Sequence, residues 1–163
     1  MIQLSALEIF EVAEQIERNG AEFYRRAAEI FDDSEVKNIF LELVEWEKAH
    51  QELFAEMREQ LSQQSGEHQA GRAEGADLID PQIMASLAVF GIEAEPSSEL
   101  TGKESIEDVL HMAIQKEKDS IVYYTGLKEF VPEATDKEKV DDIIKEEMRH
   151  IKILDQALAQ RRR

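Results

Sequence analysis

"EWEKAH", residues 45–50, and "KEEMRH", residues 145–150, both contain a Glu three residues ahead of a His. The second copy lies one hundred residues after the first. Residues three apart on an α-helix are neighbours on one face, so each motif can bring a carboxylate oxygen and an imidazole nitrogen to one point. The side chains concerned are Glu47, His50, Glu147 and His150.

The two motifs belong to a longer internal repeat. Shifted by one hundred residues, positions 13–54 match the later half of the chain without a gap. Apolar matches mean little, since helical hairpins share such patterns, so the polar and aromatic matches carry the argument. These pairs are Glu17 with Glu117, Tyr24 with Tyr124, Glu29 with Glu129, Lys37 with Lys137, Glu47 with Glu147, and His50 with His150. A Glu therefore lies thirty residues upstream of each Glu-x-x-His motif.

Apolar residues recur at helical spacing in four long segments, which predicts an all-α protein. We expect helices at about residues 4–30, 35–61, 104–130 and 136–160. Ser34 is predicted to cap the second helix. The Thr-x-x-Glu patterns that begin at Thr101 and Thr135 have the form of capping boxes and are predicted to open the third and fourth helices.

The connections predict how these helices are arranged. Short turns make two antiparallel hairpins, whereas residues 62–103 form a link far longer than usual. Such a link can return the third helix parallel to the second, which predicts an antiparallel four-helix bundle with one long crossover. Asp80 and Pro81 predict a short helix in the crossover, at about residues 83–90. We expect a single domain over residues 1–163.

Composition excludes several classes of function. The formal charge of −17 repels nucleic acid and anionic membranes but attracts cations. The chain contains no cysteine, which excludes disulfides, thiolate metal sites and iron–sulfur clusters. We see no signal peptide and no apolar stretch that could span a bilayer, so we expect a cytoplasmic protein. The basic end at residues 161–163 is predicted to be solvated.

Charged residues lie on helix stripes that should face the core. Glu17 and Glu117 project from such stripes, as do both Glu-x-x-His motifs. A buried carboxylate must be paired or bind a cation, and these stripes offer few lysines or arginines. Four carboxylates and two imidazoles therefore predict a site for two divalent metal ions, in the arrangement of di-iron and di-manganese carboxylate bundles. The alternative interpretation places these residues on solvated helix faces.

Two tyrosines and one tryptophan lie near these positions. Tyr24 and Tyr124 follow Glu17 and Glu117 by seven residues and share their helix faces. They are predicted to hydrogen-bond the metal-binding carboxylates, with a role as ordinary core residues as the alternative. Trp46 is predicted to serve packing rather than electron transfer.

The motifs resemble those of the rubrerythrin-like branch of the ferritin-like superfamily. "IERNGAEFYRRAA" at 16–28 and "EKDSIVYY" at 117–124 look like its first and third helix motifs, and the two Glu-x-x-His segments look like its second and fourth. The resemblance covers about residues 8–60 and 104–158. It implies a non-haem di-iron site that reacts with O2 or hydrogen peroxide. It also implies the ligand roles: Glu47 and Glu147 bridge the two irons, Glu17 and Glu117 are terminal ligands, and His50 and His150 bind one iron each.

This chain departs from the rubrerythrin pattern in two ways. Rubrerythrins carry a further Glu on the third helix, one turn before the matched Glu, where this chain has Ile114. Glu14, the equivalent position on the first helix, is predicted to lie at the surface. The six-residue set is therefore more similar to that of bacterioferritin. Rubrerythrins also carry a four-cysteine rubredoxin domain, so a chain without cysteine needs another protein or Fe²⁺ as electron donor.

Three functional hypotheses follow from the sequence. The first is a di-iron oxidoreductase of rubrerythrin-like type that uses hydrogen peroxide or O2, with a role in oxidative stress or iron handling. The second is a ferroxidase or iron-storage protein with Fe²⁺ as substrate, and the third is a non-enzymatic metal-binding bundle. Iron suits the oxygen and nitrogen ligands, as does manganese, and zinc can bind them too. We expect a homodimer, with no nucleic-acid or membrane partner.

Overall fold

The computed structural model describes residues 5–65, 99–131 and 133–162. In that part of the chain every regular element is helical, which confirms the all-α prediction. The elements are α1 (Ala6–Ile30), α2 (Ser34–Ser65), α4 (Ile106–Leu127), the 3₁₀ turn η4 (Lys128–Phe130) and α5 (Ala134–Arg161). The short helix predicted at 83–90 lies outside the described residues.

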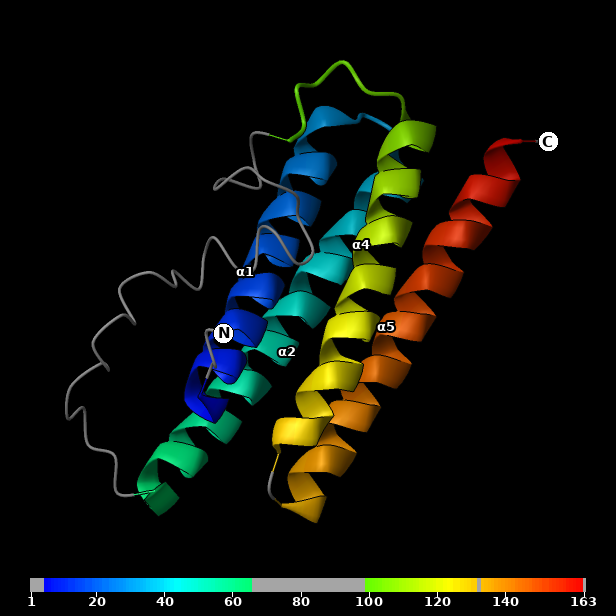
Figure 1. The fold of residues 1–163 in the computed structure, drawn as a ribbon. Coiled ribbons are helices and arrows are strands. Elements are labelled where there is room, and N and C mark those ends of the chain that lie inside the picture. The colour runs from blue at the N-terminus through cyan, green and yellow to red at the C-terminus, as the bar shows by residue number, and fades with distance from the viewer. Residues whose placement is uncertain (1–4, 66–98, 132, 163) are drawn as a thin grey trace, which may run out of the picture.

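The four long helices form a bundle with the predicted topology (Figure 1). Helix α1 is antiparallel to α2, and α4 is antiparallel to α5, so each consecutive pair is a hairpin. Helix α4 runs in the same direction as α2, which is the arrangement expected of a long crossover between them. At one end of the bundle, Arg161 of α5 pairs with Asp33 at the start of α2, so the basic end predicted to be solvated makes an ion pair within the chain.

Two helices start earlier than the sequence predicts, α2 by one residue and α5 by two. Helix α2 begins at Ser34 itself, and the preceding Asp33 is the cap, because its Oδ1 accepts from the backbone N–H of Val36 at 3.0 Å. Helix α5 begins at Ala134, one residue before the predicted cap Thr135. The first helical backbone bond of α5 already runs to the carbonyl of Glu133, which leaves Thr135 inside the first turn.

The capping box predicted at Thr101 does not open α4. Thr101 and Glu104 do bond to each other, with Thr101 Oγ1 donating to Glu104 Oε1 at 2.7 Å. Gly102 between them has φ of 84°, in the left-handed region that ends a right-handed helix, so these residues form a separate turn. A second box caps α4 instead, in which Ser105 Oγ accepts from Asp108 N at 3.1 Å.

Replacing Ser105 by Ala should lower the free energy of unfolding by about 1 kcal/mol, because the first turn of α4 loses its side-chain acceptor. Chemical denaturation followed by circular dichroism measures the change. Thr101→Ala is the matched control, since its hydroxyl caps no helix and its loss should cost less. Equal losses in the two variants would contradict this assignment of the cap.

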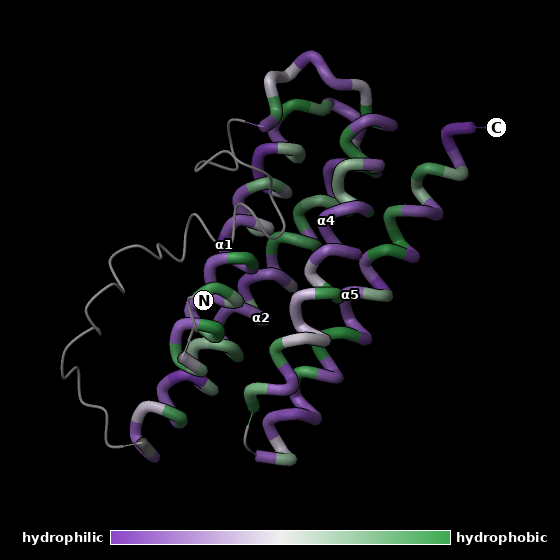
Figure 2. The backbone as a smooth tube through the Cα atoms, in the orientation of Figure 1, coloured by the Kyte–Doolittle hydropathy of each residue, from purple (hydrophilic) through white to green (hydrophobic). Residues whose placement is uncertain are grey.

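Aromatic side chains fill the bundle on both sides of its middle. Tyr24 stacks on Phe40, with ring centroids 6.0 Å apart, and Phe54 packs against Tyr124 at 4.9 Å. Figure 2 shows hydrophobic residues recurring between hydrophilic ones along each helix, as expected of helices that bury one face. These layers enclose the polar cluster described below. No described helix has the length and apolar character needed to cross a membrane.

Candidate metal centre

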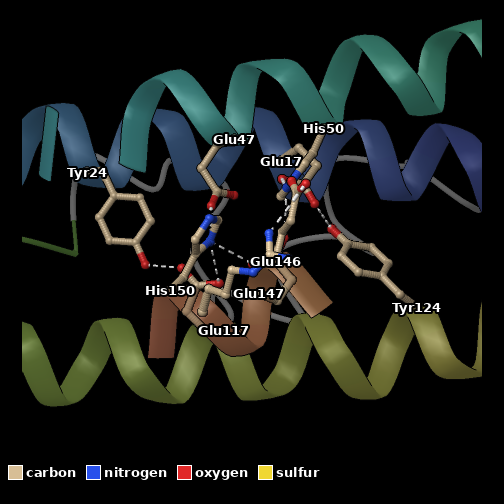
Figure 3. A network of polar contacts seen from close by, with 10 residues as sticks. Glu17, Tyr24, Glu47, His50, Glu117, Tyr124, Glu146, Glu147 and His150 are labelled. Carbon is tan, nitrogen blue, oxygen red and sulfur yellow. Dashed lines mark hydrogen bonds and ion pairs between the residues drawn. The ribbon is translucent and has the colours of Figure 1, made fainter. Parts of the chain in front are cut away.

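Six charged or titratable side chains meet in the middle of the bundle (Figure 3). All of them are buried, and the largest exposed fraction among them is 5%. They come from all four long helices: Glu17 from α1, Glu47 and His50 from α2, Glu117 from α4, and Glu147 and His150 from α5. The structure thus brings together the whole set singled out by the repeat and leaves none of it on a solvated face.

The imidazole of His50 forms one half of the cluster. Its Nδ1 lies 2.8 Å from Glu147 Oε1 and 3.5 Å from Glu17 Oε2. Its other ring nitrogen, Nε2, lies 2.7 Å from Oε2 of Glu146, a residue that the sequence analysis did not select. Nδ1 therefore faces the carboxylates of the cluster, and Nε2 faces outward.

The imidazole of His150 forms the other half. Its Nδ1 lies 3.1 Å from Glu147 Oε2, 3.4 Å from Glu47 Oε1 and 3.5 Å from Glu117 Oε2. The two imidazole rings are 5.6 Å apart and inclined by 20°. Glu147 therefore directs one carboxylate oxygen toward each histidine.

The donor atoms form two overlapping groups, and within each group they lie within 4.8 Å of one another. Glu17 and His50 belong to the first group only, and Glu117 and His150 to the second only. Glu47 and Glu147 belong to both. This overlap leaves room for two neighbouring cation positions that share the carboxylates of Glu47 and Glu147.

Several donor atoms in the cluster are buried without a hydrogen bond of acceptable geometry. They are Glu17 Oε2, Glu47 Oε1, Glu147 Oε1 and His50 Nδ1. Such atoms cost free energy unless something satisfies them. Among the described residues, no lysine or arginine pairs with any of the four carboxylates. Oxygen and imidazole nitrogen are the donors preferred by iron, manganese and zinc, so these residues fit a pair of divalent metals.

Two of the carboxyls hold their protons unusually strongly. Burial, together with the charges of Glu17, Glu147 and Glu117, raises the pKa of Glu47 well above its usual value. Burial and the charge of Glu147 likewise raise the pKa of Glu117. Four carboxylates this close cannot all be ionised without positive charge among them. Protons and metal ions therefore compete for the cluster.

The pKa values of Glu147, His50 and His150 shift in the directions that favour a charged carboxylate and charged imidazoles. Burial by itself would raise the pKa of Glu147, but its close contacts with Glu117, His150 and His50 outweigh burial and lower the pKa. Burial disfavours the charged imidazole of His50, yet the charge of Glu17 and the close contacts with Glu147 and Glu17 raise the pKa of His50 to about 12. The pKa of His150 is raised too, with bonds to Glu117 and Glu147 overcoming its burial.

Two tyrosines reach across the bundle to fix the outer carboxylates. Tyr24 of α1 donates its hydroxyl to Oε1 of Glu117 on α4, and Tyr124 of α4 donates to Oε1 of Glu17 on α1. Burial and these carboxylates raise the pKa of both phenols, which keeps the hydroxyls protonated as donors. Each bond leaves Oε2 of the same carboxylate facing the cluster. The sequence predicted bonds from the tyrosines to carboxylates of the cluster, and each tyrosine bonds the Glu of the opposite hairpin.

Gly20 lets α1 approach the carboxylate of Glu47. A Cβ added at Gly20 would lie 2.6 Å from Glu47 Oε2, which no side chain can tolerate without displacing that oxygen. Spacing alone did not mark this glycine, because the contact crosses from α1 to α2. A residue without a Cβ is therefore needed here to leave Glu47 in both groups of donors.

Gly20→Ala should reduce divalent-metal affinity by about 10-fold or more, because the added methyl displaces Glu47. The metal-free fold should lose nothing, since Ala is favoured over Gly inside a helix by about 0.5–1 kcal/mol. Calorimetric titration and thermal unfolding separate these effects. Gly126→Ala on α4 is the matched control, because its Cβ would meet nothing within 4 Å. Metal binding equal to that of the unchanged chain would refute the steric argument.

The carboxylate that completes the rubrerythrin pattern is missing from the cluster. Ile114, at its position on α4, is a buried part of the apolar core. Glu14, the equivalent residue on α1, is also buried, contrary to the prediction of a surface role. It is held by Arg58 of α2, whose Nη2 lies 3.3 Å from Glu14 Oε2. The negative charge of Glu14 is therefore already paired.

No family model matches the chain, and no curated protein matches it. Among solved structures, the crystal structure of a proposed ferritin-like diiron-carboxylate protein from Thermotoga maritima aligns with a TM-score of 0.72 and 28% sequence identity. The alignment covers 98% of this chain and 97% of that one. This chain has the ferritin-like fold.

The ferritin-like bundle explains why the sequence repeats. Its two hairpins, α1–α2 and α4–α5, face each other around the cluster, and each supplies one lone Glu and one Glu-x-x-His motif. Helix α1 then lies against α4 and α2 against α5. Equivalent residues of the two halves thereby meet across the bundle. The ring centroids of His50 and His150, for example, are 5.6 Å apart.

Proposed function

We propose that this ferritin-like protein is a non-haem di-iron carboxylate protein whose iron centre reacts with O2 or hydrogen peroxide. The observation that carries the proposal is the carboxylate of Glu147, with Oε1 at 2.8 Å from His50 Nδ1 and Oε2 at 3.1 Å from His150 Nδ1. One carboxylate that addresses both histidines suits a bridge between two metals. The description of the Thermotoga maritima protein as diiron-carboxylate supports the same assignment.

The proposed ligand roles follow from the two overlapping donor groups. Glu47 and Glu147 would bridge, because both belong to each group. Glu17 with His50 would complete one position, and Glu117 with His150 the other. Two irons bound here would supply the electrons and the free coordination position that reduction of O2 or peroxide requires.

The protein's own residues would orient the ligands and exclude water. Tyr24 and Tyr124 fix Oε1 of the two outer carboxylates, which aims each Oε2 at the centre. The aromatic layers formed with Phe40 and Phe54 close the bundle on either side of the cluster. A dry, prearranged set of donors strengthens electrostatic interactions with bound cations.

Within the superfamily, we place the chain nearer to bacterioferritin-like than to rubrerythrin-like sites. The buried Ile114 and the Arg58-bound Glu14 leave six donors, without the seventh carboxylate of rubrerythrins. This set favours oxidation of Fe²⁺ by O2 as the second candidate activity, with iron as substrate as well as resident metal. Storage of the product needs a hollow shell, and light scattering separates the expected homodimer from such an assembly.

Metal analysis and reoxidation of the reduced protein test this proposal. Protein produced with added iron should contain about two irons per chain. Its reduced form should change its absorption spectrum on addition of hydrogen peroxide or O2, and the faster oxidant identifies the physiological reaction class. An iron content near zero would overturn the di-iron assignment. Bound metal without any spectral response to either oxidant would leave a non-enzymatic metal-binding bundle.

A further inference from the structure

The two halves of the internal repeat differ at residues 46 and 146, each of which contacts one of the two histidines. Residue 46 of the first half is Trp, and the matching residue 146 of the second half is Glu. Because the halves face each other, residue 146 contacts the histidine of α2, and residue 46 contacts the histidine of α5. The outer surfaces of His50 and His150 are therefore covered by chemically different side chains.

Glu146 binds the outer nitrogen of His50. Its Oε2 lies 2.7 Å from His50 Nε2. The Glu146 side chain as a whole is 44% exposed. An imidazole that donates Nε2–H to a carboxylate keeps the lone pair of Nδ1 for a metal, and its ring orientation is fixed. Glu146 also adds a fourth carboxylate near this position, beside Glu17, Glu47 and Glu147.

Trp46 covers His150 by stacking instead. The two ring centroids are 4.9 Å apart, and the planes differ by 5°. An indole has no acceptor for an imidazole N–H. Among the described residues, the three carboxylates within ion-pair distance of His150 all approach its Nδ1. Trp46 is itself 37% exposed, so it forms the outer wall of the cluster on this side.

We propose that the residue pair Trp46 and Glu146 makes the two metal positions unequal, with the position at His50 the tighter one. The inference rests on the proposed two-metal centre and concerns what distinguishes its halves. Glu146 is a positioning residue that acts through His50. Loss of a carboxylate hydrogen-bonded to a metal-binding histidine weakens metal binding by about 10–100-fold. Among residues 5–65, 99–131 and 133–162, no carboxylate within ion-pair distance of His150 approaches its Nε2.

Titration of the metal-free full chain with Co²⁺ measures the two binding steps. The unchanged chain should bind about two Co²⁺ with separate affinities. Trp46 is the only tryptophan in the chain, so its fluorescence reports on the His150 side, and the second equivalent should produce the larger change. In Glu146→Gln, the tighter step should weaken by about 10–100-fold, while the weaker step stays nearly unchanged.

Two further variants test the same idea from the other half. Trp46→Glu should give His150 a carboxylate partner and tighten the weaker step, as measured by calorimetry. Trp46→Phe keeps an aromatic ring without an acceptor and should leave both steps near their original affinities. Glu138→Gln removes a charge from an exposed residue of α5 and is the control for net charge. Circular dichroism confirms that each variant is folded.

The outcomes separate failure of this inference from failure of the proposed function. Equal affinities in the unchanged chain would overturn the inference and leave the two-metal centre standing. The inference would also be overturned if Glu146→Gln bound Co²⁺ with the same affinities as Glu138→Gln, or if it weakened both binding steps equally. A chain that binds fewer than two Co²⁺ would overturn the proposed centre, and the inference with it.

Discussion

Replacing Glu147 by Gln is expected to reduce the metal content from about two ions per chain to one or fewer. Glu147 is one of two residues that belong to both donor groups, and its two oxygens address different histidines. A carboxamide keeps the shape of the side chain but has only one oxygen and no negative charge. It therefore cannot serve as a bridge between two cations, and both positions lose a donor together. Elemental analysis after loading and gel filtration measures the result.

The metal-free Glu147→Gln variant should remain folded, because the carboxamide keeps the shape of the side chain and can still hydrogen-bond its neighbours. Its far-ultraviolet circular dichroism should match that of the unchanged chain. Glu45→Gln is a suitable control, since its side chain is 72% exposed on the outer face of α2 and removal of its charge touches no donor. Two tightly bound ions in Glu147→Gln would show that the cluster does not use Glu147 as a shared ligand.

The six side chains of the cluster could be identified from sequence, because the spacing that marks them lies within one helix or repeats between the two halves. Glu47 and His50 share a face of α2 through a spacing of three, and the second half repeats this pattern. Period and spacing do not depend on how one helix is rotated against another. The four-helix arrangement was likewise predictable, since apolar periodicity, short turns and one long link leave few ways to bury the stripes.

Contacts between helices could not be predicted in the same way. Glu146 is adjacent to Glu147 and, in a chain with 36 acidic residues, resembles any solvated Glu. Its role depends on the rotation of α5 that carries it to His50 Nε2. Trp46 was expected to serve packing, which its stack on His150 shows, but the partner could not be named. Gly20 is marked only by the approach of Glu47 from the next helix.

The helix caps show a further limit of sequence patterns. Thr101 and Ser105 both begin a pattern of a hydroxyl followed three residues later by an acid, and in both the acid accepts from the hydroxyl and from the backbone N–H of the same residue. Only Ser105 in turn accepts from the backbone N–H of its acid. Only the second opens a helix, because the first contains Gly102 at positive φ. Side-chain spacing thus predicts the local bond, whereas the backbone conformation decides whether a helix follows.

Removing the metals should cost the fold several kcal/mol at neutral pH, and this cost should shrink as the pH falls. Ligand present at about a thousand times its Kd stabilises by about 4 kcal/mol, which for a chain of this size raises Tm by about 10 °C. Acid should remove this gain, because protons compete with metal at Glu47 and Glu117, whose pKa values are raised by burial and neighbouring carboxylates. Calorimetric melting of loaded and chelated protein at several pH values measures both effects.

The metal-free chain should itself become more stable as the pH is lowered from about 9 to 5. A carboxyl whose folded pKa is raised contributes stability that is present below its unfolded pKa and is lost as the pH rises above it, and this applies to Glu47 and Glu117. His50, with a folded pKa of about 12, has the same sign, since its contribution is present below its ordinary pKa and is lost toward pH 12. Each retained proton contributes a slope of about 1.4 kcal/mol per pH unit.

Groups with lowered pKa values act in the opposite direction, but only at lower pH. Glu147 and the cap residue Asp108 lose their contributions as the pH falls below the ordinary range of carboxyl groups, outside the interval from about 9 to 5. The double variant Glu47→Gln with Glu117→Gln removes two of the proton-holding groups, so its metal-free stability should depend less on pH. A metal-free stability that rises with pH over this interval would mean that the buried carboxylates are balanced by charges other than protons and metal ions, which would contradict the cation site itself.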